Sequence, residues 1–267
     1  MITEETFEFR PGSCPVLVSI PHAGAELPPG FTARLSAAAH DLPDTDWHLP
    51  RLYGFLDTRP VGLIRARVSR YVVDLNRAPD DTPLYAGATT GLCPDVRFDG
   101  TPLYRPGAAP DAAEIAQRVE TYWRPYHARI RAELTRLRDI HGFAVLFDAH
   151  SIKSTIPRLF PGRLPDFNLG TARGASADPA LSGAVEAALN AALGYSLAVN
   201  GRFVGGHITR SFGKPAEGWH AVQLEMAQTI YMDEDPPFAY AEDRAAKLQP
   251  HLARLVDAMI AWTGGLR

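Results

Sequence analysis

Short apolar runs and longer helical patterns alternate along this chain. The apolar runs are rich in β-branched residues and lie at 15–20, 61–74, 143–148, 195–200 and 219–226. Patterns with helical spacing lie between several of these runs, at 48–57, 111–140, 178–193 and 239–263. Because strands and helices that alternate in sequence pack as layers, this order predicts an α/β fold with a largely parallel sheet.

The clearest helical pattern is the one at 111–140. Asp111 is a suitable N-cap, and Glu114 three residues later completes a capping box. The expected apolar face consists of Ile115, Val119, Tyr122, Tyr126, Ile130, Leu134 and Leu137. Pro125 lies inside this pattern, and we therefore expect a kink there.

Length and charge limit the classes of protein that the chain can belong to. Its 267 residues suffice for one large domain or two small ones. A net charge of −3 gives no reason to expect nucleic acid or an anionic membrane as a partner, although a small anionic substrate needs only local arginines. The two cysteines, Cys14 and Cys93, form no CxxC motif. The acidic N-terminus does not resemble a signal peptide and no apolar run reaches about 20 residues, so we expect a cytoplasmic protein.

Two long segments, 75–110 and 151–177, are rich in Gly, Pro, Asp and Arg. They follow the strand regions that end at Asp74 and Asp148. Loops of this length in a compact domain are usually functional, and we expect these two to form the walls of a pocket. The chain contains no HExxH, GxSxG, P-loop or GxGxxG motif that would name the chemistry of that pocket.

Two histidines follow apolar strands in the same way. His22 comes after VLVSIP, and His150 comes after AVLFDA. Either could be a hydrogen-bonded structural histidine. As a pair at the ends of two strands they could instead bind a metal, since a catalytic zinc typically has three protein ligands, often histidines, and keeps one position for water.

The third ligand of such a site would be a carboxylate. The stretch DTDWH at 44–48 offers Asp44, Asp46 and His48, although an aspartate here could also cap a helix. Glu26, four residues after His22, is the other option. Asp148 could be a ligand, or it could orient the free nitrogen of a histidine ligand.

Several polar residues are candidates for substrate binding. Asp74, Asn76 and Arg77 alternate along SRYVVDLNR, and an arginine beside an asparagine suits a carboxylate; a salt bridge that anchors the loop is the alternative. Arg202 and Arg210 flank a Gly pair in NGRFVGGHITR, which could also be a plain surface loop.

Glu225 lies among apolar residues in VQLEMAQ. A glutamate is rarely buried without a partner, so this position needs an explanation. Burial would raise its pKa and suit a general base that works near neutral pH, and a buried ion pair with an arginine is the alternative.

Seven ordered motifs together resemble one known family. They are PHAG, DTDWH, SRYVVDLNR, DAHS, LFPGRLPDFNLGT, NGRFVGGHITR and VQLEMAQTIYM. Over about residues 8–262 the chain resembles the N-formylglutamate deformylases (N-formylglutamate amidohydrolases) of bacterial histidine degradation. The resemblance implies a single domain over 1–267, with a fold akin to the zinc carboxypeptidases: three layers, with a mixed and mostly parallel sheet between helices.

The resemblance also implies roles for individual residues. The metal ligands would be His22, Asp46 and His150, with Glu26 as a rival to Asp46. Glu225 would be the general base, and an arginine such as Arg70 or Arg210 would stabilise the oxyanion. Asn76 and Arg77 resemble a carboxylate-binding pair, and Arg202 and Arg210 are further substrate-binding candidates. One zinc ion is expected, although histidine and aspartate also suit other divalent transition metals.

The implied reaction is hydrolysis of N-formyl-L-glutamate to L-glutamate and formate. Two alternatives remain open. A related metallo-amidohydrolase would act on another N-acyl or N-formimino acidic amino acid, and a non-catalytic protein would bind acidic amino acids without turnover or metal.

Overall fold

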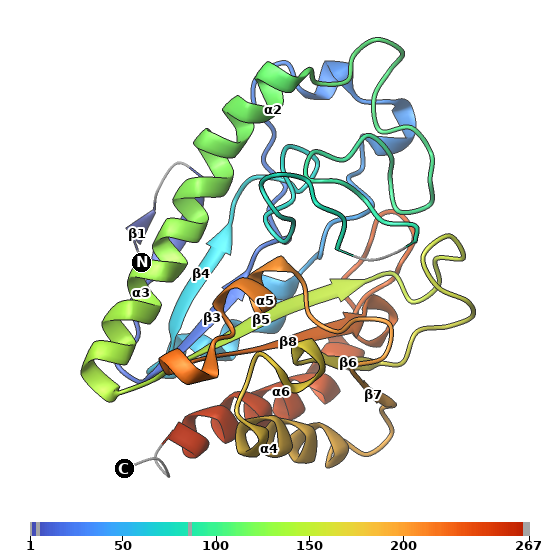
Figure 1. Cartoon of the computed structure of the whole chain (residues 1–267). Coiled ribbons are helices and arrows are strands. Elements are labelled where there is room, and N and C mark those ends of the chain that lie inside the picture. Colours follow the sequence, from blue (N-terminus) through green and yellow to red (C-terminus); the bar gives the residue numbers. More distant parts are fainter. Residues whose placement is uncertain (1, 4–5, 85–86, 264–267) are drawn as a thin grey trace.

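A single mixed sheet runs through the computed structural model, which describes residues 2–3, 6–84 and 87–263 (Figure 1). Within these residues the strand order is β1-β2-β4-β3-β5-β8-β6-β7. The eight strands are β1 Ile2–Thr3, β2 Phe7–Arg10, β3 Val16–Ile20, β4 Gly62–Ala66, β5 Ala144–Ile152, β6 Phe167–Gly170, β7 Leu197–Val199 and β8 Trp219–Ala227.

The centre of the sheet is parallel and its flanks are mixed. Strands β4, β3, β5 and β8 pair in parallel. On one side β2 pairs antiparallel with β4, and on the other side β6 pairs antiparallel with β8 while β7 runs parallel to β6. The predicted mixed, mostly parallel sheet is therefore confirmed.

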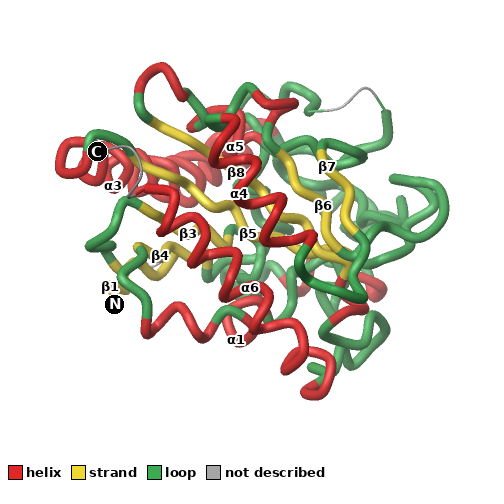
Figure 2. The backbone as a smooth tube through the Cα atoms, turned by 90° about the horizontal axis from the view of Figure 1, so that it is seen from below, coloured by secondary structure: helices red, strands yellow, loops and turns green. Residues whose placement is uncertain are grey.

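Helices cover both faces of this sheet. They are α1 Leu49–Leu52, α2 Ala112–Arg118, α3 Arg124–His141, α4 Pro179–Asn190, α5 His207–Phe212 and α6 Glu242–Thr263. Figure 2 shows α4 and α6 across the near face, with α3 beyond the sheet. None of the helices in the described ranges has the length and apolar character that a membrane span requires.

Alternating side chains of the central strands supply the two cores. On β5, Val145 and Phe147 belong to the apolar cluster shared with α4 and α6. Ala144 and Leu146 belong to the cluster shared with α3 and α5. Because successive strand residues point to opposite faces, one fully buried run serves both layers, and the expected three-layer architecture follows.

The start of the predicted helix 111–140 is confirmed, but its irregularity lies elsewhere. The Asp111 side chain accepts a hydrogen bond from the Glu114 amide (2.8 Å). The Glu114 carboxylate forms ion pairs with Arg34 and Arg118. A π-helical turn, Val119–Trp123, separates α2 from α3. The helix continues through this turn into α3, and Pro125 lies two residues beyond it. Because a proline lacks an amide hydrogen and its ring crowds the carbonyl four residues earlier, the departure from α-helix occupies the turn before the proline.

The predicted strand 61–74 was wrong in its second half. Strand β4 ends at Ala66, and the following residues turn, with the Val72 amide bonded to Ser69 O. Tyr71 and Val72 are buried in a separate cluster beneath the long loops, with Phe31, Leu35, Leu103 and Tyr104. The apolar run was therefore misassigned because its second half packs against loop residues.

Other boundaries also differ from the predictions. The helix expected at 48–57 is α1 followed by a 3-10 turn, Gly54–Thr58. Strand β5 continues to Ile152, so His150 lies on the strand itself. Strand β6 falls inside the predicted loop 151–177, and α5 begins inside the stretch 200–210, for which no helix was predicted. Both elements are too short to give a clear periodic signal.

The packing of α3 yields a stability test. Leu134 is fully buried against the sheet, whereas Ile140 on the same helix is 61% exposed. We expect Leu134→Ala to lower the free energy of unfolding by about 2–5 kcal/mol, because it removes buried surface and leaves a cavity. The matched change Ile140→Ala is expected to stay within about 0.5 kcal/mol. Urea denaturation measures both, and equal losses would contradict this packing.

Candidate active site

The candidate residues gather where the central parallel strands end. In Figure 1 the arrowheads of β5 and β8 point towards the side that holds the long loops. His22 lies two residues beyond β3. His150 and Glu225 are register partners on β5 and β8. The carboxyl end of a parallel sheet is where α/β proteins place ligand sites, so this arrangement fits the expectation for the fold.

Three buried side chains form a group that could hold a metal ion. His22, Asp46 and His150 each offer one donor atom, and these atoms lie within 4.8 Å of one another. The two Nδ1 atoms are 3.1 Å apart, and Asp46 Oδ2 lies 3.5 Å from His150 Nδ1 and 3.9 Å from His22 Nδ1. Neighbouring donors in a tetrahedral zinc site with bonds of about 2.0–2.1 Å are about 3.3 Å apart, so the spacing suits such an ion.

Each of the two imidazole rings forms a hydrogen bond through Nε2. This bond determines whether the Nδ1 atom of the same ring carries a hydrogen or a lone pair. His22 Nε2 is 2.8 Å from Asp74 Oδ1, and His150 Nε2 is 2.8 Å from Asp148 Oδ2. A carboxylate only accepts, so each Nε2 carries a hydrogen, and each ring, when neutral, directs a lone pair from Nδ1. Two lone pairs and a carboxylate then meet at one point, an arrangement that could hold a cation. Paired carboxylates behind histidine ligands are the usual support of a metal site.

The pKa values of the two histidines differ when no ion is present. Burial, followed by the charge of Arg70, lowers the pKa of His22. Burial alone would also lower the pKa of His150, but the Asp148 carboxylate outweighs it and raises that pKa well above its usual value. A proton on His150 can therefore supply the positive charge that the converging donors need.

A buried chain of hydroxyl groups supports Asp148. Ser19 Oγ donates to Asp148 Oδ1 (2.9 Å). Since the hydroxyl hydrogen of Ser19 is used there, Tyr126 OH must be the donor in its 3.1 Å contact with Ser19 Oγ. The chain from Tyr126 on α3 through Ser19 to Asp148 thus determines the orientation of His150 from the helical layer.

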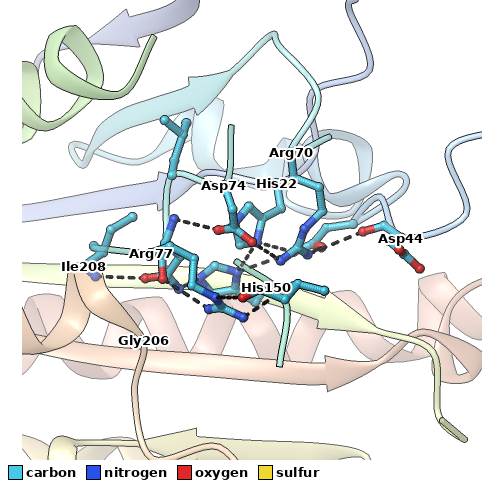
Figure 3. A network of polar contacts seen from close by, with 12 residues as sticks. His22, Asp44, Arg70, Asp74, Arg77, His150, Gly206 and Ile208 are labelled. Atoms are coloured by element: carbon cyan, nitrogen blue, oxygen red, sulfur yellow. Dashed lines mark hydrogen bonds and ion pairs between the residues drawn. The ribbon is translucent and has the colours of Figure 1, made fainter. Parts of the chain in front are cut away.

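Arg70 connects the two carboxylates near His22. Its Nη2 donates to Asp74 Oδ2 (2.6 Å), and its Nη1 lies 3.5 Å from Asp46 Oδ1. Figure 3 shows Arg70 between Asp74 and Asp44, whose backbone oxygen is 3.4 Å from Nη1. The guanidinium is buried over the ring of Phe98, 4.6 Å from its centroid. Arg70 therefore supplies a fixed positive charge beside the group formed by His22, Asp46 and His150.

Glu225 is buried and faces the same cavity. Burial raises its pKa to about 8, partly offset by the charge of His150. Among the described residues no arginine forms an ion pair with Glu225, so the buried ion pair considered as an alternative is not observed. A buried carboxyl group without a salt-bridge partner is suited to exchange a proton with a ligand in the cavity.

The cavity contains most of the predicted residues. Its walls are His22, Arg70, Asn76, Arg77, Leu84, Ala88, Thr89, Thr90, Phe98, His150, Ile152, Leu159, Arg202, Phe203, Gly206, Gln223 and Glu225. These side chains come from the sheet edge and from both long loops, in agreement with the expectation that the loops form pocket walls.

Two arginines of the cavity are held in the same way. Arg77 Nε donates to Thr90 O (2.8 Å), and Arg202 Nε donates to Leu159 O (2.8 Å). Each guanidinium is thus anchored to a different long loop. Arg210 is exposed, does not line the cavity, and donates to Gly205 O (2.9 Å). The geometry brings Arg77 and Arg202 to the cavity and leaves Arg210 outside its walls.

Both ends of the Asn76 amide are engaged inside the protein. Oδ1 accepts from the Ile208 amide (2.8 Å), and Nδ2 is 3.4 Å from Asp148 Oδ2. The side chain lies so close to Gly206 that a Cβ atom there would be 2.3 Å from Asn76 Nδ2. Glycine at 206 is therefore needed for this contact. Through its two ends, the Asn76 amide links α5 to Asp148, the carboxylate that orients His150.

The other polar residues that the sequence offered as metal ligands do not belong to the group formed by His22, Asp46 and His150. Glu26 is exposed and forms an ion pair with Arg67 (2.9 Å). Asp44 accepts from the Phe98 amide (2.9 Å), and His48 Nε2 donates to Phe238 O (2.7 Å). The N-cap of α1 is His48, without a side-chain capping bond, so DTDWH does not serve as a helix cap.

Several supporting residues were not identified from the sequence. Asp74 was considered only as part of the polar end of SRYVVDLNR, while Ser19, Tyr126, Thr90 and Gln223 were not considered for the site. Ser19 sits inside an apolar strand, and a buried polar residue in such a strand is a signal that could have indicated it. Gln223, a buried polar residue on β8, gives a signal of the same kind. The partners of Asp74, Tyr126 and Thr90 depend on loop and helix placement that no local pattern predicts.

Comparisons with known proteins agree with this arrangement. Residues 14–232 match the family model of N-formylglutamate amidohydrolase. The chain is 53% identical over 259 residues to an N-formylglutamate deformylase of Pseudomonas aeruginosa and 51% identical to one of Pseudomonas putida, each match covering 97% of both sequences.

A solved structure extends the agreement to the fold. The N-formylglutamate amidohydrolase of Ralstonia eutropha JMP134 superposes with a TM-score of 0.83 and 26% identity, covering 97% of this chain and 99% of that one. Family model, relatives and structure all cover the segments that carry His22, Asp46, His150 and Glu225. The chain belongs to the N-formylglutamate amidohydrolase family.

Proposed function

We propose that this protein is a metal-dependent hydrolase that converts N-formyl-L-glutamate and water into L-glutamate and formate. The observation that carries the proposal is the convergence of His22 Nδ1, Asp46 Oδ2 and His150 Nδ1 beside a cavity that also presents Glu225 and three arginines. The names of the two Pseudomonas relatives support this substrate.

We assign His22, Asp46 and His150 as the residues that hold the ion, with zinc as the expected metal. Their distances fit one small cation, and the carboxylates of Asp74 and Asp148 keep both rings in the tautomer that binds it. When bound, the ion would act as a Lewis acid that polarises the formyl oxygen and lowers the pKa of a bound water to roughly 7.

Glu225 is proposed as the group that moves the proton. It would accept a proton from the attacking water as the new C–O bond forms at the formyl carbon. It would then donate that proton to the glutamate nitrogen as the C–N bond breaks, which releases formate and a free amine. Its register position opposite His150 on the neighbouring strand supports this assignment.

The arginines are proposed to recognise negative charge. Arg70, beside Asp46, is assigned to the oxygen that becomes negative at the formyl carbon. Arg77 and Arg202 are assigned to the two carboxylates of the substrate, because both line the cavity and both are anchored through Nε. Asn76 is assigned to hold Asp148 rather than the substrate. Arg210 is not assigned to the substrate, because it does not line the cavity.

Turnover of paired substrates tests the proposed function. The protein loaded with zinc is expected to release formate from N-formyl-L-glutamate much faster than acetate from N-acetyl-L-glutamate, because formyl is the smallest acyl group. Comparable rates on both would favour a broader amidohydrolase. Binding of the substrate without turnover, by a protein that takes up no metal, would instead favour a binding protein for acidic amino acids.

Two acidic variants test the metal ligands. Asp46→Ala is expected to lose stoichiometric zinc, because one of three ligands is removed. Glu26→Ala is the matched control, since Glu26 only pairs with Arg67 at the surface, and it is expected to retain zinc. Metal analysis of dialysed protein measures both. Retention of full zinc by Asp46→Ala would remove Asp46 from the ligand set.

Glu225→Gln tests the proton-transfer role. The amide keeps the shape of the side chain but cannot accept the proton of water, so kcat should fall by roughly 10²–10⁴. Zinc content and KM should change little. If Glu225 served mainly to stabilise the fold, the variant would lose about 3–5 kcal/mol of stability together with activity. Measuring kcat, zinc content and melting temperature on one preparation distinguishes the two roles.

A further inference from the structure

The segment Leu75–Arg77 belongs to no strand or helix, yet it carries or adjoins much of the site. Asp74 precedes it and orients His22 (2.8 Å). The Asn76 side chain contacts Asp148, which orients His150, and Arg77 lines the cavity. The backbone of this turn must therefore be held in place by contacts from outside it.

Three successive carbonyl groups of the segment accept hydrogen bonds from other elements. Leu75 O is 2.8 Å from His127 Nε2, which must be the donor because a carbonyl oxygen only accepts. Asn76 O accepts from the His207 amide at the start of α5 (3.3 Å). Arg77 O accepts from the indole Nε1 of Trp123 (2.9 Å).

Two of these donors come from the junction of the π-helical turn with α3. Trp123 ends the π turn and His127 lies four residues later, so the two rings stack with centroids 3.7 Å apart and an interplanar angle of 12°. Both side chains are buried. Arg118, the last residue of α2, donates to Val72 O (2.9 Å). The continuous helix formed by α2, the π turn and α3 thus donates hydrogen bonds to the carbonyl groups of residues 72, 75 and 77.

The π turn explains how one continuous helix makes all three contacts. A π turn contains one residue more than an α-helical turn, which shifts the phase of the following helix by about 100°. With that shift, Trp123 and His127 face the Leu75–Arg77 segment, while Arg118 before the π turn still faces Val72. Such turns are frequent at functional sites.

We propose that Trp123 and His127 are positioning residues for the reaction: through Arg77 O and Leu75 O they hold the segment that places Arg77 and Asn76 at the cavity. This inference rests on the proposed function only for its kinetic consequence. If the segment loosens, binding of the substrate carboxylate should weaken while the proton-transfer step at Glu225 is affected less.

Trp123→Phe tests this, because phenylalanine keeps an aromatic ring and loses the N–H group. KM for N-formyl-L-glutamate is expected to rise roughly 2- to 13-fold, which corresponds to one net hydrogen bond of about 0.5–1.5 kcal/mol, with kcat within about twofold. Amide hydrogen exchange of the segment around 74–77 is expected to become faster. Zinc content should remain stoichiometric.

Trp219→Phe is the matched control. Trp219 is buried in the same apolar cluster as Trp123, but its Nε1 has no hydrogen-bond partner among the described residues. The same change of side chain there removes similar ring volume without breaking a bond to the segment. We expect a comparable loss of melting temperature with unchanged KM and unchanged exchange at 74–77.

His127 provides an independent pair of variants. His127→Phe keeps the stacked ring and removes the donor, and should reproduce the effects of Trp123→Phe. His127→Gln retains an N–H group that can reach Leu75 O, and should return KM and exchange towards wild type.

Wild-type KM and exchange in both Trp123→Phe and His127→Phe would overturn the inference, as would equal changes in Trp219→Phe. Absence of turnover in the wild-type protein would instead refute the proposed function, and the exchange measurements would still decide the positioning role.

Discussion

The close approach of two imidazole lone pairs is the constraint on which the rest of the site depends. His22 Nδ1 and His150 Nδ1 are 3.1 Å apart, and Asp46 Oδ2 is close to both. With both rings neutral, these donor atoms repel one another unless a cation or a proton lies between them. The surrounding residues hold it together all the same: Asp74 and Asp148 orient the rings, and Ser19 and Tyr126 hold Asp148.

The charges around this group indicate the kind of cation that suits it. Asp46, Asp74 and Asp148 are almost completely buried, and within the described part of the chain the guanidinium that pairs with two of them is that of Arg70. With both histidines neutral, these four groups leave an excess of two negative charges in a region of low dielectric. Buried charge must be compensated. A divalent cation would neutralise the excess, and protonation of His150 compensates only part of it.

The sequence predicted which polar residues lie together better than it predicted the elements that carry them. The central strands and the cap at Asp111 were foreseen, because buried runs and capping residues are local signals. The end of β4 was missed, since Tyr71 and Val72 are apolar but pack against loop residues. His22, Asp46 and His150 were identified by motif and residue type. The roles of Ser19, Tyr126 and Trp123 depend on how α3 lies on the sheet, which no local pattern contains.

The walls of the cavity depend on small cores of their own. Phe98, Ile152, Ile156, Phe160, Leu164 and Phe203 form an apolar cluster that joins both long loops to the segment before α5. Arg77 and Arg202 are anchored to carbonyl groups of these same loops. A guanidinium on a free loop would lose much of its binding energy in becoming ordered. Because the loops are packed in advance, that cost is met during folding, and the two arginines proposed to bind the substrate carboxylates are held in place before any ligand arrives.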